Sequence, residues 1–175
     1  MGQTRAIDFG KLTLRDAMDL AVLVEEEAKE RYGELADQMK LHHNAEAEQF
    51  FRSMLHIEDG HERKLAERRK QVFGDAPRTV RLEMLFDVEA PEYDEARATM
   101  TARQAFETAL HAEQKSCAFY ESVAAATKDA EARALFEELR EHEKEHVALV
   151  EKAIAKLPPE AALRAEDVDD GPVAL

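Results

Sequence analysis

The sequence predicts an all-α protein, a bundle of four helices with a long crossover between the second helix and the third. Apolar residues recur at steps of three and four in four long segments, which is the period of an amphipathic α-helix. Glycine and proline, with six and five copies in 175 residues, are scarce, as expected for a helix-rich chain. The length is that of one ordinary domain.

The four helices are expected at residues 13–39, 44–73, 101–127 and 129–156. Each carries an apolar seam on one face, so each needs partners that cover this seam. The crossover is expected at 75–100, where prolines interrupt the helical pattern and apolar residues should cover the bundle or a partner subunit. Such a crossover lets two helical hairpins lie side by side.

Five residues mark the ends of these helices. Thr13, Asn44, Thr101 and Asp129 stand where a side-chain oxygen can accept a hydrogen bond from the first turn. Gly74 is expected to end the second helix, because glycine suits the residue that follows a helix C-terminus.

The chain is expected to form one domain over residues 1–157, followed by an acidic, mobile tail at 158–175. The formal net charge of −14 argues against nucleic acid or an anionic membrane as a partner. No run approaches the roughly 18 apolar residues that a membrane span needs, and residues 1–11 lack a signal-peptide pattern. We therefore expect a soluble, cytoplasmic protein, and a homodimer for a bundle of this size.

The chemistry of the chain is expected to centre on a motif that occurs twice, Glu-x-x-His. Glu58 with His61, and Glu143 with His146, each place a carboxylate and an imidazole three residues apart, on the same face of a helix. All four residues fall on the apolar seams of the second and fourth helices. Their side chains should therefore be buried in the bundle.

A second glutamate precedes each motif, on the helix before it. Glu25 is followed seven residues later by Tyr32, and Glu113 is followed by Tyr120 at the same spacing. The order Glu, Tyr, Glu-x-x-His thus occurs in both halves of the chain, which read as an internal repeat. A pseudo-twofold bundle is expected, in which each hairpin supplies one half of a site.

The repeat predicts a carboxylate-bridged centre for two metal ions. Four carboxylates are too costly to bury without a counter-charge, so cations should lie between them. Mixed oxygen and nitrogen ligands suit iron or manganese better than calcium, magnesium or a thiolate-rich zinc site. We expect two iron ions, with manganese or mixed metals as the alternative. The predicted ligands are Glu25, Glu58, His61, Glu113, Glu143 and His146.

An alternative without metal is a buried ion-pair network in which His61 and His146 are both protonated. Two such charges cannot balance four carboxylates, which argues against this interpretation. Tyr32 and Tyr120 are the candidate catalytic residues, expected to hydrogen-bond ligand carboxylates around the metals. The alternative for both tyrosines is simple packing on the seam.

Three other features carry weaker signals. Cys117, the single cysteine, excludes an internal disulfide and is expected to be a small buried hydrophobe, with a redox-active thiol near the metal as the alternative. His42 and His43 lie in a polar loop, where we expect a solvated turn and no metal site. The basic residues at 63–70 suit a helix C-terminus, and a docking patch for an acidic electron donor is the alternative.

These motifs resemble those of a known family. The stretches Glu25–Tyr32, Glu58–His61 and Ala134–His146 are similar to those of rubrerythrin-type members of the ferritin-like superfamily, over about residues 12–157. Residues 68–81 also resemble the soluble domain at the front of membrane-bound ferritins. The resemblance implies a ferritin-like four-helix bundle.

The resemblance also implies a non-haem di-iron oxidoreductase that acts on Fe(II) with dioxygen or hydrogen peroxide, as a ferroxidase or a peroxidase. The alternative is an iron-binding module for storage, delivery or sensing, without sustained turnover. Rubrerythrins carry a further glutamate three residues after the third-helix ligand, where this chain has Ser116, and this difference favours the ferroxidase. The sequence has no rubredoxin-like Cys-x-x-Cys module, so a separate donor or the substrate iron would supply electrons. Glu58 and Glu143 are expected to bridge the metals, with Glu25 and Glu113 as terminal ligands.

Overall fold

The computed structural model describes residues 7–80 and 101–158. Within them the chain forms a short 3-10 helix, η1 (Phe9–Lys11), and four α-helices, α1 (Leu14–Leu41), α2 (Ala45–Phe73), α3 (Ala102–Ala126) and α4 (Ala130–Ile154). These ranges contain no strand, and none of their helices is long and apolar enough to span a membrane. The prediction of an all-α four-helix bundle is therefore confirmed, with every helix end within about two residues of its expected place.

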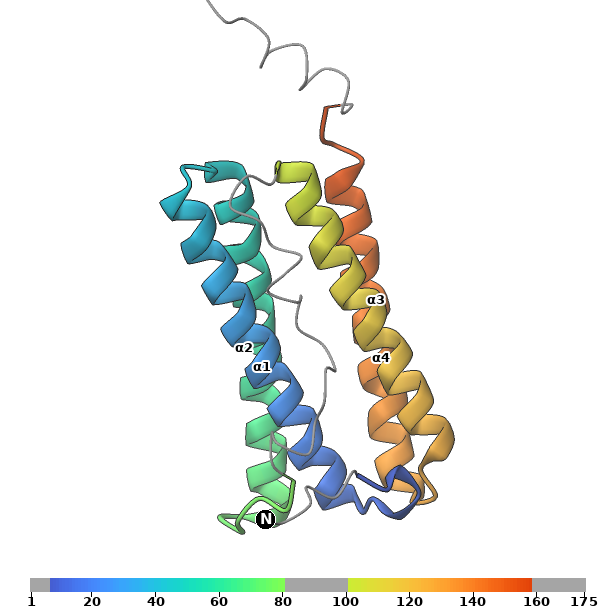
Figure 1. Cartoon of the computed structure of the whole chain (residues 1–175). Helices are drawn as coiled ribbons and strands as arrows, with labels where there is room; N and C mark the ends of the chain where they lie inside the picture. The colour runs from blue at the N-terminus through green and yellow to red at the C-terminus, as the bar shows by residue number, and fades with distance from the viewer. Residues whose placement is uncertain (1–6, 81–100, 159–175) are drawn as a thin grey trace, which may run out of the picture.

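The helices form two antiparallel hairpins, α1 with α2 and α3 with α4, which stand side by side (Figure 1). Helices α1 and α4 run in one direction, and α2 and α3 run in the other. An ion pair between Arg68 of α2 and Glu138 of α4, at 2.9 Å, links the hairpins on one side of the bundle. The expected crossover is described only up to residue 80, and the expected tail lies almost wholly outside the described residues.

The predicted helix caps are present. Thr13 and Thr101 each form a capping box, in which the cap side chain and the side chain three residues later satisfy each other's backbone N–H groups. Asn44 and Asp129 accept hydrogen bonds from backbone N–H groups of their first turns. Gly74 follows α2 with a φ of +60°, a conformation that glycine adopts without strain.

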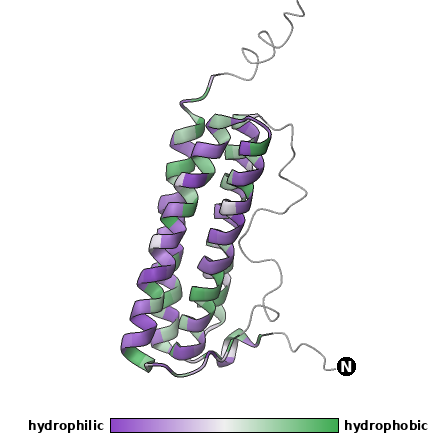
Figure 2. Ribbon diagram, turned by 90° about the vertical axis from the view of Figure 1, so that its left-hand side faces the viewer, coloured by the Kyte–Doolittle hydropathy of each residue, from purple (hydrophilic) through white to green (hydrophobic). Residues whose placement is uncertain are grey.

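The apolar core has two parts, one at each end of the bundle, and all four α-helices contribute to both. One part includes Leu20 and Phe136, and the other includes Met39 and Phe51. Hydrophilic and hydrophobic residues alternate along each ribbon, as amphipathic helices require (Figure 2). Between the two parts lies a layer of buried ionisable side chains.

Aromatic packing repeats between the two hairpins. Tyr32 stacks on Phe51 with ring centroids 6.1 Å apart, and Tyr120 stacks on Phe136 at 6.3 Å. The interplanar angles, 30° and 26°, are also similar. The repeat read from residue spacing thus has matching packing on both sides.

A buried ion pair near the start of α1 was not predicted. Every residue from 17 to 25 is buried, including Asp19, whose carboxylate accepts a hydrogen bond from Arg69 of α2. The backbone N–H of Thr79 donates to Asp19 at 2.7 Å, so the chain after α2 folds over this carboxylate. Arg69, expected in a basic cluster at the helix C-terminus, instead points inward, because a buried carboxylate needs a counter-charge.

Candidate metal centre

Six ionisable side chains meet in the layer between the two apolar parts of the core. Helices α1 and α3 supply one carboxylate each, and α2 and α4 each supply a carboxylate and an imidazole one turn apart. They are the six predicted ligands. Five are at most 5% exposed: Glu25, Glu58, Glu113, Glu143 and His146. The sixth, His61, has a side chain 19% exposed and lies on the solvent side of the layer.

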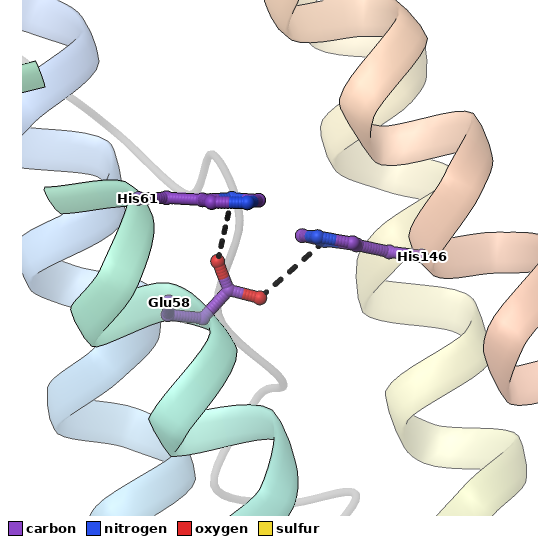
Figure 3. Close-up of side chains that lie close together, drawn as sticks. All are labelled: Glu58, His61 and His146. Carbon is purple, nitrogen blue, oxygen red and sulfur yellow. Dashed lines mark ion pairs between the residues drawn. The ribbon is translucent and has the colours of Figure 1, made fainter. Parts of the chain in front are cut away.

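Glu58 lies between the two imidazoles. Its carboxylate oxygens are 3.8 Å from Nδ1 of His61 and 3.5 Å from Nδ1 of His146, which belong to different hairpins (Figure 3). The carboxylate therefore faces both halves of the layer at once. This is the position that a carboxylate shared by two metal ions would occupy.

His146 faces three carboxylates of the layer, those of Glu58, Glu113 and Glu143. Its Nδ1 lies 3.1 Å from Glu113 Oε2 and 3.6 Å from Glu143 Oε2. Two groups of donor atoms lie close enough together to hold a metal ion, and His146 belongs to both. One group adds Glu58 and His61, and the other adds Glu113 and Glu143.

His61 shows that these donors fit a metal. Its Nδ1 is buried and has no hydrogen-bond partner among the described residues. The nearest carboxylate oxygens belong to Glu58, at 3.8 Å, and Glu25, at 4.0 Å, too far for a hydrogen bond. An imidazole nitrogen that faces two carboxylates without donating to either leaves space for a cation that all three can bind. Carboxylates and imidazoles are also ligands that iron and manganese accept.

Two of the buried carboxyl groups, Glu58 and Glu143, hold protons when no cation is present, whereas the hydrogen bond and charge of His146 lower the pKa of Glu113 despite its burial. Burial, together with the charges of Glu113 and Glu25, raises the pKa of Glu58 well above its usual value. Burial likewise raises the pKa of Glu143 to about 8. A cation that neutralises the layer would therefore replace protons.

The two imidazoles differ in charge. Burial and the neighbouring His146 lower the pKa of His61 to about 4, so His61 is neutral near pH 7. Burial opposes the charge of His146 too, but its hydrogen bonds to Glu113 and Glu143 raise the pKa of His146 to about 11. An ion-pair network with both imidazoles protonated, considered above as an alternative to metal, is therefore disfavoured.

The two candidate catalytic tyrosines are both buried. The hydroxyl of Tyr32 donates a hydrogen bond to Glu113, which belongs to the opposite hairpin. Burial raises the pKa of Tyr32, so its hydroxyl keeps the proton that it donates. Tyr120 is fully buried and stacks on Phe136. Tyr32 thus contacts a predicted ligand directly, as the sequence analysis expected.

Ser116 faces the layer, whereas Cys117 is less buried than expected. Ser116 is 2% exposed and lines a cavity of about 10 Å³ beside Tyr32, Glu58 and Glu113. Cys117, expected on the buried seam, is half-buried, with Sγ 4.0 Å from the backbone oxygen of Arg140. The helical turn places the serine, one residue earlier, toward the layer.

His142 is a neighbour of the layer that the sequence analysis missed. Its ring centroid lies 5.4 Å from that of His61 on the other hairpin. A signal was present, because His142 and Glu145 repeat the three-residue spacing of the inner motif on the same helix. His42 and His43 are exposed in the turn between α1 and α2, as expected.

Comparison with known proteins gives two matches. A family model described as Rubrerythrin matches residues 16–154, a range that contains all six side chains of the layer. The chain is also similar to the crystal structure of an uncharacterised conserved protein from Magnetospirillum magnetotacticum, with 29% sequence identity and a TM-score of 0.65. That alignment covers 85% of this chain and 97% of the other. No curated protein matches.

Proposed function

The chain belongs to the rubrerythrin family, and from this premise we propose that it is a non-haem di-iron carboxylate oxidoreductase. It would oxidise Fe(II) with dioxygen or hydrogen peroxide. One observation carries the proposal: four buried carboxylates and two imidazoles converge, and Nδ1 of His61 faces two of the carboxylates without a hydrogen bond. Such a set of donors is costly to bury except around cations.

The six side chains would divide between two iron ions. Glu58, which approaches both imidazoles, would hold both ions, and Glu143, beside His146, would be the second shared ligand. Glu25 would be a terminal ligand on the His61 side, and Glu113 one on the His146 side. When bound, two Fe(II) ions supply the two electrons that reduce an O–O bond.

The side chains around the centre would exclude water, orient the ligands and release protons when cations bind. Burial keeps water away from the carboxylate oxygens and strengthens the attraction of the carboxylates for cations. Tyr32 fixes the orientation of Glu113 through its hydrogen bond, a role that typically raises metal affinity. Glu143, with a pKa of about 8 in the metal-free protein, would release its proton when it binds a cation.

Ser116 supports ferroxidase chemistry over peroxide turnover. It stands where rubrerythrins carry a further glutamate, and the cavity beside it, about 10 Å³, has room for about one water molecule. The centre would therefore work without a seventh carboxylate. Substrate Fe(II) can then serve as the electron source, without a separate reductase.

The test is anaerobic titration with Fe(II), followed by rapid mixing with oxygen or with peroxide while near-ultraviolet absorption is recorded. We expect two Fe(II) per chain, and oxidation by oxygen at a rate that depends on all six ligands. Faster oxidation by peroxide, with turnover once a reductant is added, would indicate a peroxidase. Oxidation without return to the reduced state would indicate an iron-binding module, and a lack of stoichiometric binding would overturn the proposal.

A further inference from the structure

A cavity of about 240 Å³ lies between α2 and α4, directly outside the centre. Residues of both helices line it, among them His61, Lys64, Arg68, Glu138, His142 and Glu145. His61 belongs both to this cavity and to the centre, and it is the most exposed of the six predicted ligands. The cavity is therefore where the buried layer comes nearest to solvent among the described residues.

Imidazole rings lead from this cavity into the centre. The ring of His142 lies 5.4 Å from that of His61, and the ring of His61 lies 4.9 Å from that of His146. Glu145, exposed at the cavity, follows His142 by three residues, the spacing that places two side chains on one face of a helix. Helix α4 thus carries one carboxylate and imidazole pair toward the centre and a second pair toward the cavity.

We propose that this cavity is the entrance through which divalent metal ions reach the centre, and that His142 and Glu145 bind each ion in transit. The inference rests on the proposed two-metal function. A first-row divalent ion that leaves water needs replacement ligands at each step, and nitrogen and oxygen donors of the right type stand at both ends of this route. Passing from His142 to His61 moves the ion from one hairpin to the other.

The charges of the cavity predict how fast ions enter. Arg68 and Glu138 pair at 2.9 Å, so their charges largely cancel. Lys64 and Glu145 then act on an incoming cation in opposite directions, because one repels it and the other attracts it. A route for neutral oxidants alone would not respond to these two charges.

The experiment follows Co(II) loading of the metal-free full chain by anaerobic stopped-flow absorbance, together with an equilibrium titration. Four proteins are compared: the unaltered chain, His142→Ala/Glu145→Gln, Lys64→Gln, and the control His56→Ala/Glu137→Gln. The control removes the same two residue types from exposed positions outside the cavity. Equilibrium stoichiometry reports on the centre, and the loading rate reports on the entrance.

All four proteins should bind two Co(II) at equilibrium. We expect His142→Ala/Glu145→Gln to load about tenfold more slowly than the control, and Lys64→Gln to load faster than the unaltered chain. If the His142→Ala/Glu145→Gln protein loaded at the control rate, the proposed entrance would be wrong, but the proposed two-metal centre would be unaffected. A loss of one Co(II) from that variant at equilibrium would also overturn the entrance, since the pair would then belong to the centre. If the unaltered chain bound no Co(II), the proposed function and the entrance would fail together.

Discussion

The imidazole rings of His61 and His146 are stacked, with centroids 4.9 Å apart and planes inclined by 12°. The two rings come from different hairpins, so this contact joins the halves of the bundle at the level of the buried carboxylates. Two stacked imidazoles repel each other when both are charged, which agrees with a neutral His61 beside a protonated His146. In a two-metal centre, His61 would bind an ion directly, whereas His146 would first lose a proton.

Replacing Glu58 by alanine should abolish binding of two metal ions while helicity stays largely intact. The side chain faces both imidazoles, and the helix that carries it is held by apolar packing at both ends. Metal content by titration and helicity by circular dichroism measure the two effects. Glu67→Ala, an exposed change on the same helix, is the control. Full occupancy by two ions in the Glu58→Ala protein would refute the ligand assignment.

Replacing Tyr32 by phenylalanine should weaken metal binding about tenfold to a hundredfold, because Glu113 loses the hydrogen bond that orients it. The ring and its stack on Phe51 are kept, so the fold should persist. Competition titration with a chromophoric chelator gives the affinity. An unchanged affinity would mean that Tyr32 only packs against its neighbours.

Metal affinity should fall as the pH is lowered from about 8 to about 6, and binding should release protons. In the metal-free protein, the pKa of Glu143 is about 8 and that of His146 is about 11, so both groups are largely protonated near pH 7. Each must lose its proton to bind an ion, and raising the pH removes this competition. Mn(II) titrations at several pH values test the direction of this pH dependence, and a pH-sensitive dye in weak buffer detects the released protons. Equal affinity across the range, with no protons released, would contradict it.

Replacing Asp19 by alanine should destabilise the fold by about 3–5 kcal/mol, because Arg69 would remain buried without its counter-charge. The double change Asp19→Ala/Arg69→Met should recover part of this loss, since it removes both charges. Urea unfolding measures the free energies. Asp37→Ala is the control, because the ion pair of Asp37 with Arg52 is exposed and should contribute little. If Asp19→Ala lowered the free energy of unfolding as little as Asp37→Ala, the ion pair of Asp19 with Arg69 would not hold the chain after α2 in place.

Sequence periodicity predicted much of the fold, because it records which face of a helix is apolar. The caps at Thr13 and Thr101 and the helix end at Gly74 could also be predicted, because each depends only on residues within one turn. The convergence of the six ionisable side chains also followed from spacing. Whether they bind metal stays a prediction for the titrations above.

Contacts between elements distant in the sequence were not readable. Asp19 lies off the predicted seam of α1, and its partners Arg69 and Thr79 are 50 and 60 residues away. Similarly, His142 repeats the three-residue spacing with Glu145 on its own helix, but it lies beside the layer only because α2 brings His61 next to it. Periodicity locates a side chain on its own helix, but the neighbouring helix decides what the side chain meets.

The division of the core by the ionisable layer has a consequence for folding cooperativity. Each helix crosses from one apolar cluster to the other, and at the crossing it meets carboxylates instead of close-packed hydrocarbon. In the metal-free chain, we therefore expect the two ends of the bundle to open separately in hydrogen exchange, each with its own free energy. The predicted ligands come from all four helices and lie at the boundary, so bound metal would join the two ends and make protection rise together at both.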